Sequence, residues 1–118
     1  MSSNVFSISE IDDDPQYNSR GVIEPVDVDY LVKDIALRGQ LVPIIIRPIE
    51  GGEKKYRVVA GFSRCLAMRV LREKKILATL KEYNDEEAMI VNVSENLVRK
   101  DLTILQEAKA LAWWGLRK

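Results

Sequence analysis

The order of apolar patterns along these 118 residues predicts an α+β fold, in which helices pack on a small mixed β-sheet and a helical C-terminal extension follows. Short apolar runs bounded by glycine, proline and acidic turns are typical of strands. Longer segments with apolar residues three and four positions apart are typical of amphipathic helices. The two patterns occur without an internal repeat, and the length fits one domain with a modest core.

Four segments have the character of strands. VFSISEI alternates at residues 5–11 and is followed by an acidic loop that contains a proline. VPIIIRPI at residues 42–49 is typical of a buried strand, and a glycine-rich hairpin turn connects it to KYRVVAG at residues 55–61. ILATLKEY at residues 76–83 completes the predicted sheet.

Two helices are expected between these strands. In residues 26–40, Asp27 can cap the first turn and Gly39 ends the helix. The apolar stripe of this helix consists of Val28, Leu31, Val32 and Ile35. Residues 61–75 form the next helix, and its inward-facing residues are Leu66, Val70 and Leu71.

The C-terminal part of the chain predicts two more helices. Residues 85–100 begin with acids, which the positive end of the helix dipole favours. Residues 101–118 form the last helix, where Thr103 and Gln106 fit a capping box.

This pattern divides the chain into an α+β core at residues 1–93 and a helical extension at residues 94–118. The adjacent Trp113 and Trp114 are too large to pack together on one small sheet. We therefore expect them to contact a downstream segment or a partner chain, with the sequence forming the N-terminal piece of a longer protein.

The composition excludes several kinds of chemistry. The chain has no histidine, which removes the commonest general base, every Ser-His or Cys-His pair and most zinc sites. The single Cys65 fits a reducing compartment; nearby arginines are expected to lower its pKa, but no base or second cysteine is present to use it. With no signal sequence and no apolar run of membrane-spanning length, we expect a cytoplasmic protein.

Charge is distributed unevenly along the chain. Residues 1–36 contain eight acids and two cations, a net charge of −6, and residues 37–118 carry the compensating +6. Such asymmetry indicates either an anion-facing surface or solvated faces that happen to differ in sign.

The stretch VVAGFSR predicts an anion site. A strand runs into Gly61 and a helix begins at once, with Ser63 and Arg64 in its first turn. Free backbone N–H groups, a glycine that permits close approach, a hydroxyl and a guanidinium together suit a phosphate. In the alternative, Ser63 acts only as a helix cap.

The stretch SENLVRKDL groups an acid, an amide and a cation. Glu95 and Asn96 supply oxygen ligands of the kind found in Mg²⁺–phosphate sites, and Arg99 lies one turn further on. The alternative is a surface helix end with a Glu95–Arg99 ion pair worth about 0.3–0.5 kcal/mol. Arg20, in the acidic loop, can pair with its neighbours or reach toward an anion.

Taken in this order, these stretches resemble the N-terminal domain of the ParB family of DNA-partition proteins, over residues 4–112. SENLVRKDLTILQEAKA is similar to the family's Glu-Asn-x-x-Arg-x-Asp-Leu box, which is its most specific part. Arg20 falls at the Arg of an Asn/Gln-Pro-Arg motif. RGQLVPIIIRP resembles the Gly-x-x-Gln-Pro-x-x-x-Arg stretch, and GFSRCLA stands at the Gly-Glu-Arg-Arg-x-Arg-Ala box.

The resemblance implies a ParB/sulfiredoxin-like fold that binds CTP with Mg²⁺, dimerises through its last helices and acts as a nucleotide-gated clamp on DNA. The implied positions are Gly61 and Arg64 for the phosphates, Arg99 and Arg20 on the phosphate side, Gly39 and Pro43 for the base pocket, and Glu95 and Asn96 for the metal. The residue pattern adds Ser63 to the phosphate group.

The sequence departs from the family at this site. In the phosphate box the family's charged residues are replaced by Phe62, Ser63 and Leu66, and the glutamine of the base-pocket stretch is Val42. Each lost charge-assisted contact is worth about 1.5–3 kcal/mol. Two hypotheses follow: a weakened CTP clamp, or an adaptor that works without nucleotide.

We therefore predict the N-terminal domain of a ParB-like segregation protein that associates with the nucleoid or a plasmid. It links DNA-bound partition complexes to each other or to a ParA-type ATPase, and a DNA-binding region is expected to follow it. The alternative is a nucleotide-hydrolysing or nuclease enzyme of the same fold. Sulfiredoxin chemistry is not expected, because Phe62 stands where the catalytic cysteine would be.

Overall fold

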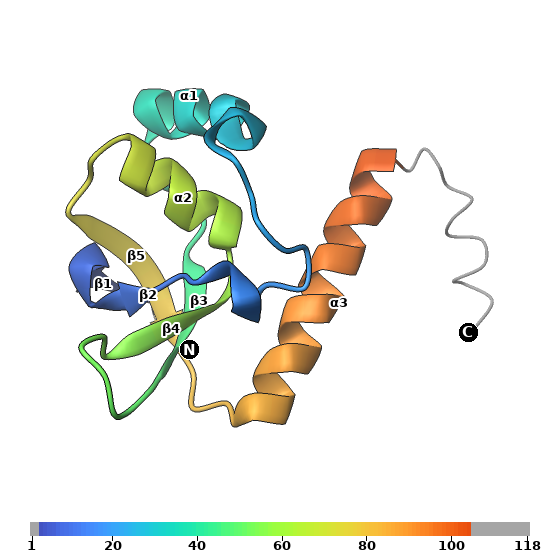
Figure 1. Cartoon of the computed structure of the whole chain (residues 1–118). Helices are drawn as coiled ribbons and strands as arrows, with labels where there is room; N and C mark the ends of the chain where they lie inside the picture. The colour runs from blue at the N-terminus through green and yellow to red at the C-terminus, as the bar shows by residue number, and fades with distance from the viewer. Residues whose placement is uncertain (1–2, 105–118) are drawn as a thin grey trace.

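A computed structural model describes the backbone of residues 3–104 and the side chains of residues 3–97. Five strands form one mixed sheet in the order β1-β5-β3-β4-β2, as the α+β prediction requires (Figure 1). The strands are β1 (Asn4–Ser7), β2 (Ile11–Asp12), β3 (Ile44–Pro48), β4 (Tyr56–Ala60) and β5 (Lys75–Leu80). The described α-helices are α1 (Asp29–Arg38), α2 (Phe62–Val70) and α3 (Asp85–Ile104).

The prediction of one strand at residues 5–11 is wrong, because a 3₁₀ turn at Ile8–Glu10 divides it. The two pieces then pair at opposite edges of the sheet, β1 antiparallel to β5 and β2 parallel to β4. Ile8 and Ile11 are both buried, and the three-residue period of the turn brings both into the core. Strict alternation would have sent them to opposite faces.

Helices α1 and α2 lie together on one side of the sheet, and their apolar faces cover the core (Figure 1). The buried cluster includes Val28, Leu31, Ile35, Ile44, Ile46, Val58, Cys65 and Ile76. The predicted stripe of α1 is therefore confirmed, as is its end at Gly39, whose φ is 84°. Asp27 does not cap α1: it belongs to a preceding 3₁₀ turn, Pro25–Val28, and accepts a hydrogen bond from the backbone N–H of Glu24.

The predicted helix at residues 61–75 ends early. α2 stops at Val70, Arg72 takes a left-handed φ of 62°, and β5 already begins at Lys75. Val70 is 44% exposed, so its predicted inward position is wrong. Phe62, Cys65, Ala67 and Met68 form the buried face of α2 instead.

Helix α3 stands beside the sheet against β4, next to the loop that precedes α1 (Figure 1). It remains helical through Ile104, so no new helix begins at residue 101. The predicted boundary at residue 93 lies inside α3, and the division into two parts stays a prediction. The capping box at Gln106 and the tryptophan pair lie outside the described residues. Within residues 3–104 no helix is long and apolar enough to cross a membrane.

Candidate functional site

Two hollows lie between α3 and the rest of the domain, and they share Asn18 and Asn92. The smaller one, here called the polar pocket, has a volume of about 10 Å³. Its lining includes Arg20, Gly61, Phe62, Ser63, Glu95 and Asn96. The larger one, here called the α3 cleft, has a volume of about 530 Å³ and is lined by residues of the Gln16–Ser19 segment, β3, β4 and the first half of α3.

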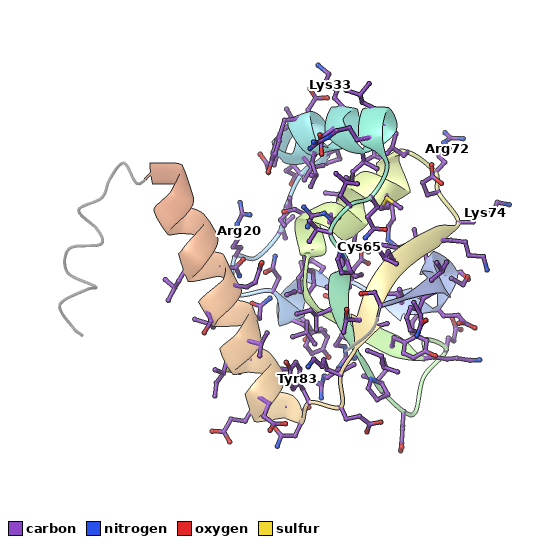
Figure 2. All side chains as sticks on the ribbon, turned by 180° about the vertical axis from the view of Figure 1, so that it is seen from behind. Arg20, Lys33, Cys65, Arg72, Lys74 and Tyr83 are labelled. Carbon is purple, nitrogen blue, oxygen red and sulfur yellow. The ribbon has the colours of Figure 1, made fainter. Side chains whose placement is uncertain are left out.

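The polar pocket brings together five of the residues that the sequence predicts for an anion site. Arg20 comes from the loop before α1, Gly61 and Ser63 from the start of α2, and Glu95 and Asn96 from α3. Figure 2 shows Arg20 between the domain body and α3. These residues are separated by up to 76 positions in the chain, so the fold and not the sequence places them side by side.

Gly61 is required by the backbone at the start of α2. Its φ of 102° lies in the left-handed region that side chains disfavour. A Cβ built on Gly61 would lie 2.6 Å from Cγ2 of Ile44, a contact that real Cβ atoms do not make. The glycine therefore allows β4 to turn directly into α2, and the start of the helix, at Gly61, Phe62 and Ser63, lines the pocket.

Two polar side chains in the pocket have capacity for a ligand. The Ser63 hydroxyl is buried yet forms no hydrogen bond within the described part of the chain. The Arg20 guanidinium likewise has no ion pair among the described side chains, although its own backbone N–H donates to Asn18 at 3.3 Å. A buried polar group without a partner is costly, so a small anion or water is the natural complement.

An asparagine network forms the wall between the two hollows. Asn92, 4% exposed, accepts from the backbone N–H of Ser19 at 2.7 Å and donates to the carbonyl of Val59 at 2.8 Å. Asn96 donates to the Ser19 hydroxyl at 2.5 Å and to Oδ1 of Asn18 at 3.3 Å. The network joins the Arg20 loop, strand β4 and α3, and thereby fixes the position of the polar pocket.

The residues predicted for Mg²⁺ have suitable chemistry. Asn96 uses its amide N–H groups within the network, which leaves its carbonyl oxygen available, and Glu95 lines the same pocket. Among the described residues no cluster of three acids, cysteines or histidines is present. This donor set suits Mg²⁺, which takes few protein ligands and otherwise binds phosphate and water. The side chain of Arg99, a residue of α3, lies outside the described residues.

The other predicted site residues are not in the polar pocket. Arg64 lies in the first turn of α2 but does not line it. Gly39 ends α1 and Pro43 precedes β3, and neither lines a described hollow. Next to them, Gln40 accepts from the N–H of Leu77 at 2.7 Å and donates to its carbonyl at 2.8 Å, which fixes the loop to β5.

The unusual residues of the GFSR stretch have structural roles. Phe62 is 7% exposed and belongs to the core cluster, and Leu66 packs against that cluster. Both also line a hollow of about 220 Å³ that adjoins the polar pocket through Asn18, Ile23 and Phe62. Positions that are charged in the family pattern are thus apolar surfaces here.

Cys65 does not have the lowered pKa that its arginine neighbours predict. The thiol is fully buried in the core, and burial raises its pKa to about 12. Asp13, hydrogen-bonded to Arg69 at 3.0 Å, raises the pKa further and outweighs the opposite effect of Arg69. The thiol is therefore neutral and inert at physiological pH.

Sequence reasoning missed Asn18 and Asn92. Asn18 stands two positions before Arg20, and Asn92 precedes Asn96 by one helical turn. The i, i+4 spacing of two asparagines on one helix is a signal that a polar face meets the domain there. Only the folded chain identifies the carbonyl of Val59 as a partner.

Solved structures place this fold in a known class. ParB from Caulobacter crescentus, in its complex with CTP-γ-S, matches 93% of this chain and 61% of its own at a TM-score of 0.76 and 27% identity. Sulfiredoxin from Arabidopsis thaliana matches 73% of this chain and 91% of its own at a TM-score of 0.59 and 19% identity. This match shows the fold alone. The architecture is therefore the ParB/sulfiredoxin-like fold.

The sequence identifies the family within that fold. A sequence model of the ParB N-terminal domain matches residues 3–97, and the chain belongs to this family. The nucleoid occlusion protein of Listeria innocua is 35% identical over 95 residues, and that of Bacillus cereus 36%. Each match covers 80% of this chain and about a third of the length of the relative.

Proposed function

We propose that this domain belongs to a DNA-segregation protein and that its polar pocket binds the phosphates of CTP with Mg²⁺. One observation carries the proposal. The fold brings into one small pocket a guanidinium and a buried hydroxyl that have no partner among the described side chains, a helix start and two oxygen ligands. A ParB that is 27% identical was solved with a CTP analogue, which supports the same ligand here.

Each pocket residue has a proposed role. The N–H groups after Gly61 and the Ser63 hydroxyl donate hydrogen bonds to a phosphate, and Arg20 closes over it from the loop. Glu95 and Asn96 would hold Mg²⁺, which would offset the negative charge of the phosphates. Arg64 of α2 and Arg99 of α3 are proposed for the phosphate side, and Gly39 and Pro43 for the base pocket.

The pocket must widen to admit a triphosphate. Its volume of about 10 Å³ is enough for one water molecule. The adjoining hollow of about 220 Å³ provides the space into which it can open. Because the Asn92 and Asn96 hydrogen bonds close the pocket, we propose that nucleotide binding shifts α3 relative to the Arg20 loop.

A nucleotide-dependent shift of α3 would let the domain change its contacts with partners during segregation. We propose that the domain links DNA-bound complexes to each other, through its C-terminal helices, or to a ParA-type ATPase. A structural relative, ParB from Caulobacter crescentus, was solved with the centromeric parS site, and DNA contact is proposed for the full-length protein. The proposed location is the cytoplasm, on the nucleoid or a plasmid.

Calorimetry with CTP, ATP and GTP, each with Mg²⁺, tests the proposal. We expect heat from CTP, and its loss or a drop in affinity of at least about tenfold in Arg20→Gln. Arg38→Gln is the matched control, because Arg38 pairs with Asp34 on the exposed face of α1. No heat at millimolar nucleotide would exclude the CTP clamp and favour an adaptor that works without nucleotide.

A further inference from the structure

The α3 cleft has the size and lining of a ligand site. Its volume of about 530 Å³ lies within the roughly 300–1,000 Å³ typical of small-molecule pockets. The walls are largely apolar and include Val58 and Val59 of β4 with Met89 and Val93 of α3. Two arginines, Arg47 and Arg57, provide its cationic groups.

These arginines are placed unusually. Arg47 on β3 and Arg57 on β4 are direct cross-strand partners, and like charges in this position repel each other. Both are largely withdrawn from solvent, with side chains 12% and 20% exposed. A pair of partly desolvated guanidinium groups on one face favours an anion between them.

Of the two carboxylates that pair with these arginines, Asp85 at the rim does little to neutralise them. Arg47 bonds to Asp85 at 2.8 Å and to the carbonyl of Tyr83, but the Asp85 side chain is 95% exposed and lies at the rim. Figure 2 shows Tyr83 at the base of α3. A pair so exposed is screened by water and contributes little.

Arg57 has donors to spare. Its Nε donates to Asp12 at 3.0 Å, and its guanidinium stacks over the ring of Tyr17 at 3.7 Å. The two terminal nitrogens form no hydrogen bond within the described part of the chain. Tyr17 thus holds the guanidinium in place, and its terminal nitrogens can donate to a ligand.

We propose that the α3 cleft binds a small organic anion with an apolar or aromatic body. The body packs on Val59, Met89 and Val93, and the anionic group receives hydrogen bonds from Arg57. The cleft is separated from the polar pocket by Asn18 and Asn92, so this ligand does not occupy the proposed nucleotide pocket. The proposal therefore stands whether or not the domain binds CTP.

Fluorescence titration with anilinonaphthalene sulfonate tests it, with uncharged N-phenyl-naphthylamine as the probe that lacks only the anion. We expect one saturable site for the sulfonate and affinity for the neutral probe weaker by about tenfold or more. Arg57→Gln should remove this difference while leaving the neutral probe unchanged. Circular dichroism of the variant establishes that it is folded.

A matched pair on α3 locates the site without disturbing the core. Met89, 66% exposed, lines the cleft, whereas the neighbouring Ile90, 56% exposed, does not. Met89→Glu should weaken sulfonate binding about tenfold, and Ile90→Glu should change it less than about twofold. Equal effects of the two substitutions, or an unchanged affinity in Met89→Glu, would overturn the proposal.

Discussion

The polar pocket and the α3 cleft lie on opposite sides of the same asparagine wall, yet they differ in chemistry and in size. The pocket is water-sized and lined by a glycine, a hydroxyl, a guanidinium and an amide. The cleft is some fifty times larger and mostly apolar. One helix supplies both, since Met89 and Val93 face the cleft and Glu95 and Asn96 face the pocket.

The difference shows how a single helix can serve two surfaces. Successive residues of an α-helix are rotated by about 100°, so within two turns the face of α3 toward the domain changes from apolar residues, Met89 and Val93, to polar ones, Glu95 and Asn96. Asn92 lies where the rows meet and is the only buried residue of α3 among residues 85–97, whose side chains are described. Polar contacts, and not apolar packing, therefore hold this part of α3 to the domain.

Among substitutions at the polar pocket, Gly61→Ala should reduce stability the most. The added methyl would collide with Ile44 and force a left-handed residue to carry a side chain. We expect a loss of about 2–5 kcal/mol in the free energy of unfolding, measured by urea denaturation. Gly52→Ala is the control, because its Cβ would meet nothing closer than 4.0 Å; equal losses in the two variants would contradict the account of Gly61.

Asn92→Ala should weaken the wall that both hollows share. The substitution leaves the Ser19 N–H and the Val59 carbonyl without their partner. A loss of about 1–3 kcal/mol is expected, with faster hydrogen exchange at Ser19. Asn96→Ala removes more exposed hydrogen bonds and should cost less. The reverse order would show that Asn92 does not join the three elements.

Two aspartates pair with the arginines of the cleft, and they differ in solvent exposure. Asp12 pairs with Arg57, and its side chain is 21% exposed. Asp12→Asn removes the charge of this partner and should lower the free energy of unfolding by about 1–2 kcal/mol. Asp85→Asn acts on a side chain that is 95% exposed and should cost no more than about 0.5 kcal/mol. Thermal denaturation at low and high salt measures both. Equal costs would mean that the depth of the cleft does not determine the strength of its ion pairs.

The smallest effect on stability at neutral pH is expected from the ionisation of Cys65. Its pKa in the folded protein is raised to about 12 from the ordinary value of 9.0, so the folded state holds the proton more tightly than the unfolded state. The corresponding stability is complete below pH 9 and decreases as the pH rises toward 12. Comparing melting temperatures of the wild type and Cys65→Ala between pH 7 and pH 10.5 tests this. A constant difference across that range would contradict the raised pKa.

The fold class and most elements could be predicted because their signals are local. Alternation and helical spacing are properties of neighbouring residues, and the stripe at Val28, Leu31 and Ile35 is buried as its period indicates. The first strand could not be predicted correctly, because the turn at Ile8–Glu10 depends on the sheet edges that it connects. The end of α2 depends in the same way on where β5 must begin.

The sequence by itself determined which groups can hold an anion, since the kinds of residue in GFSR and SEN and the absence of histidine limit the chemistry. Tertiary structure decided which of them meet: Arg20, Gly61, Ser63, Glu95 and Asn96 share a pocket, whereas Gly39 and Pro43 lie elsewhere. It also decided the state of Cys65. Its pKa depends on solvent exclusion by the whole core, which overrides the charges of its neighbours in sequence.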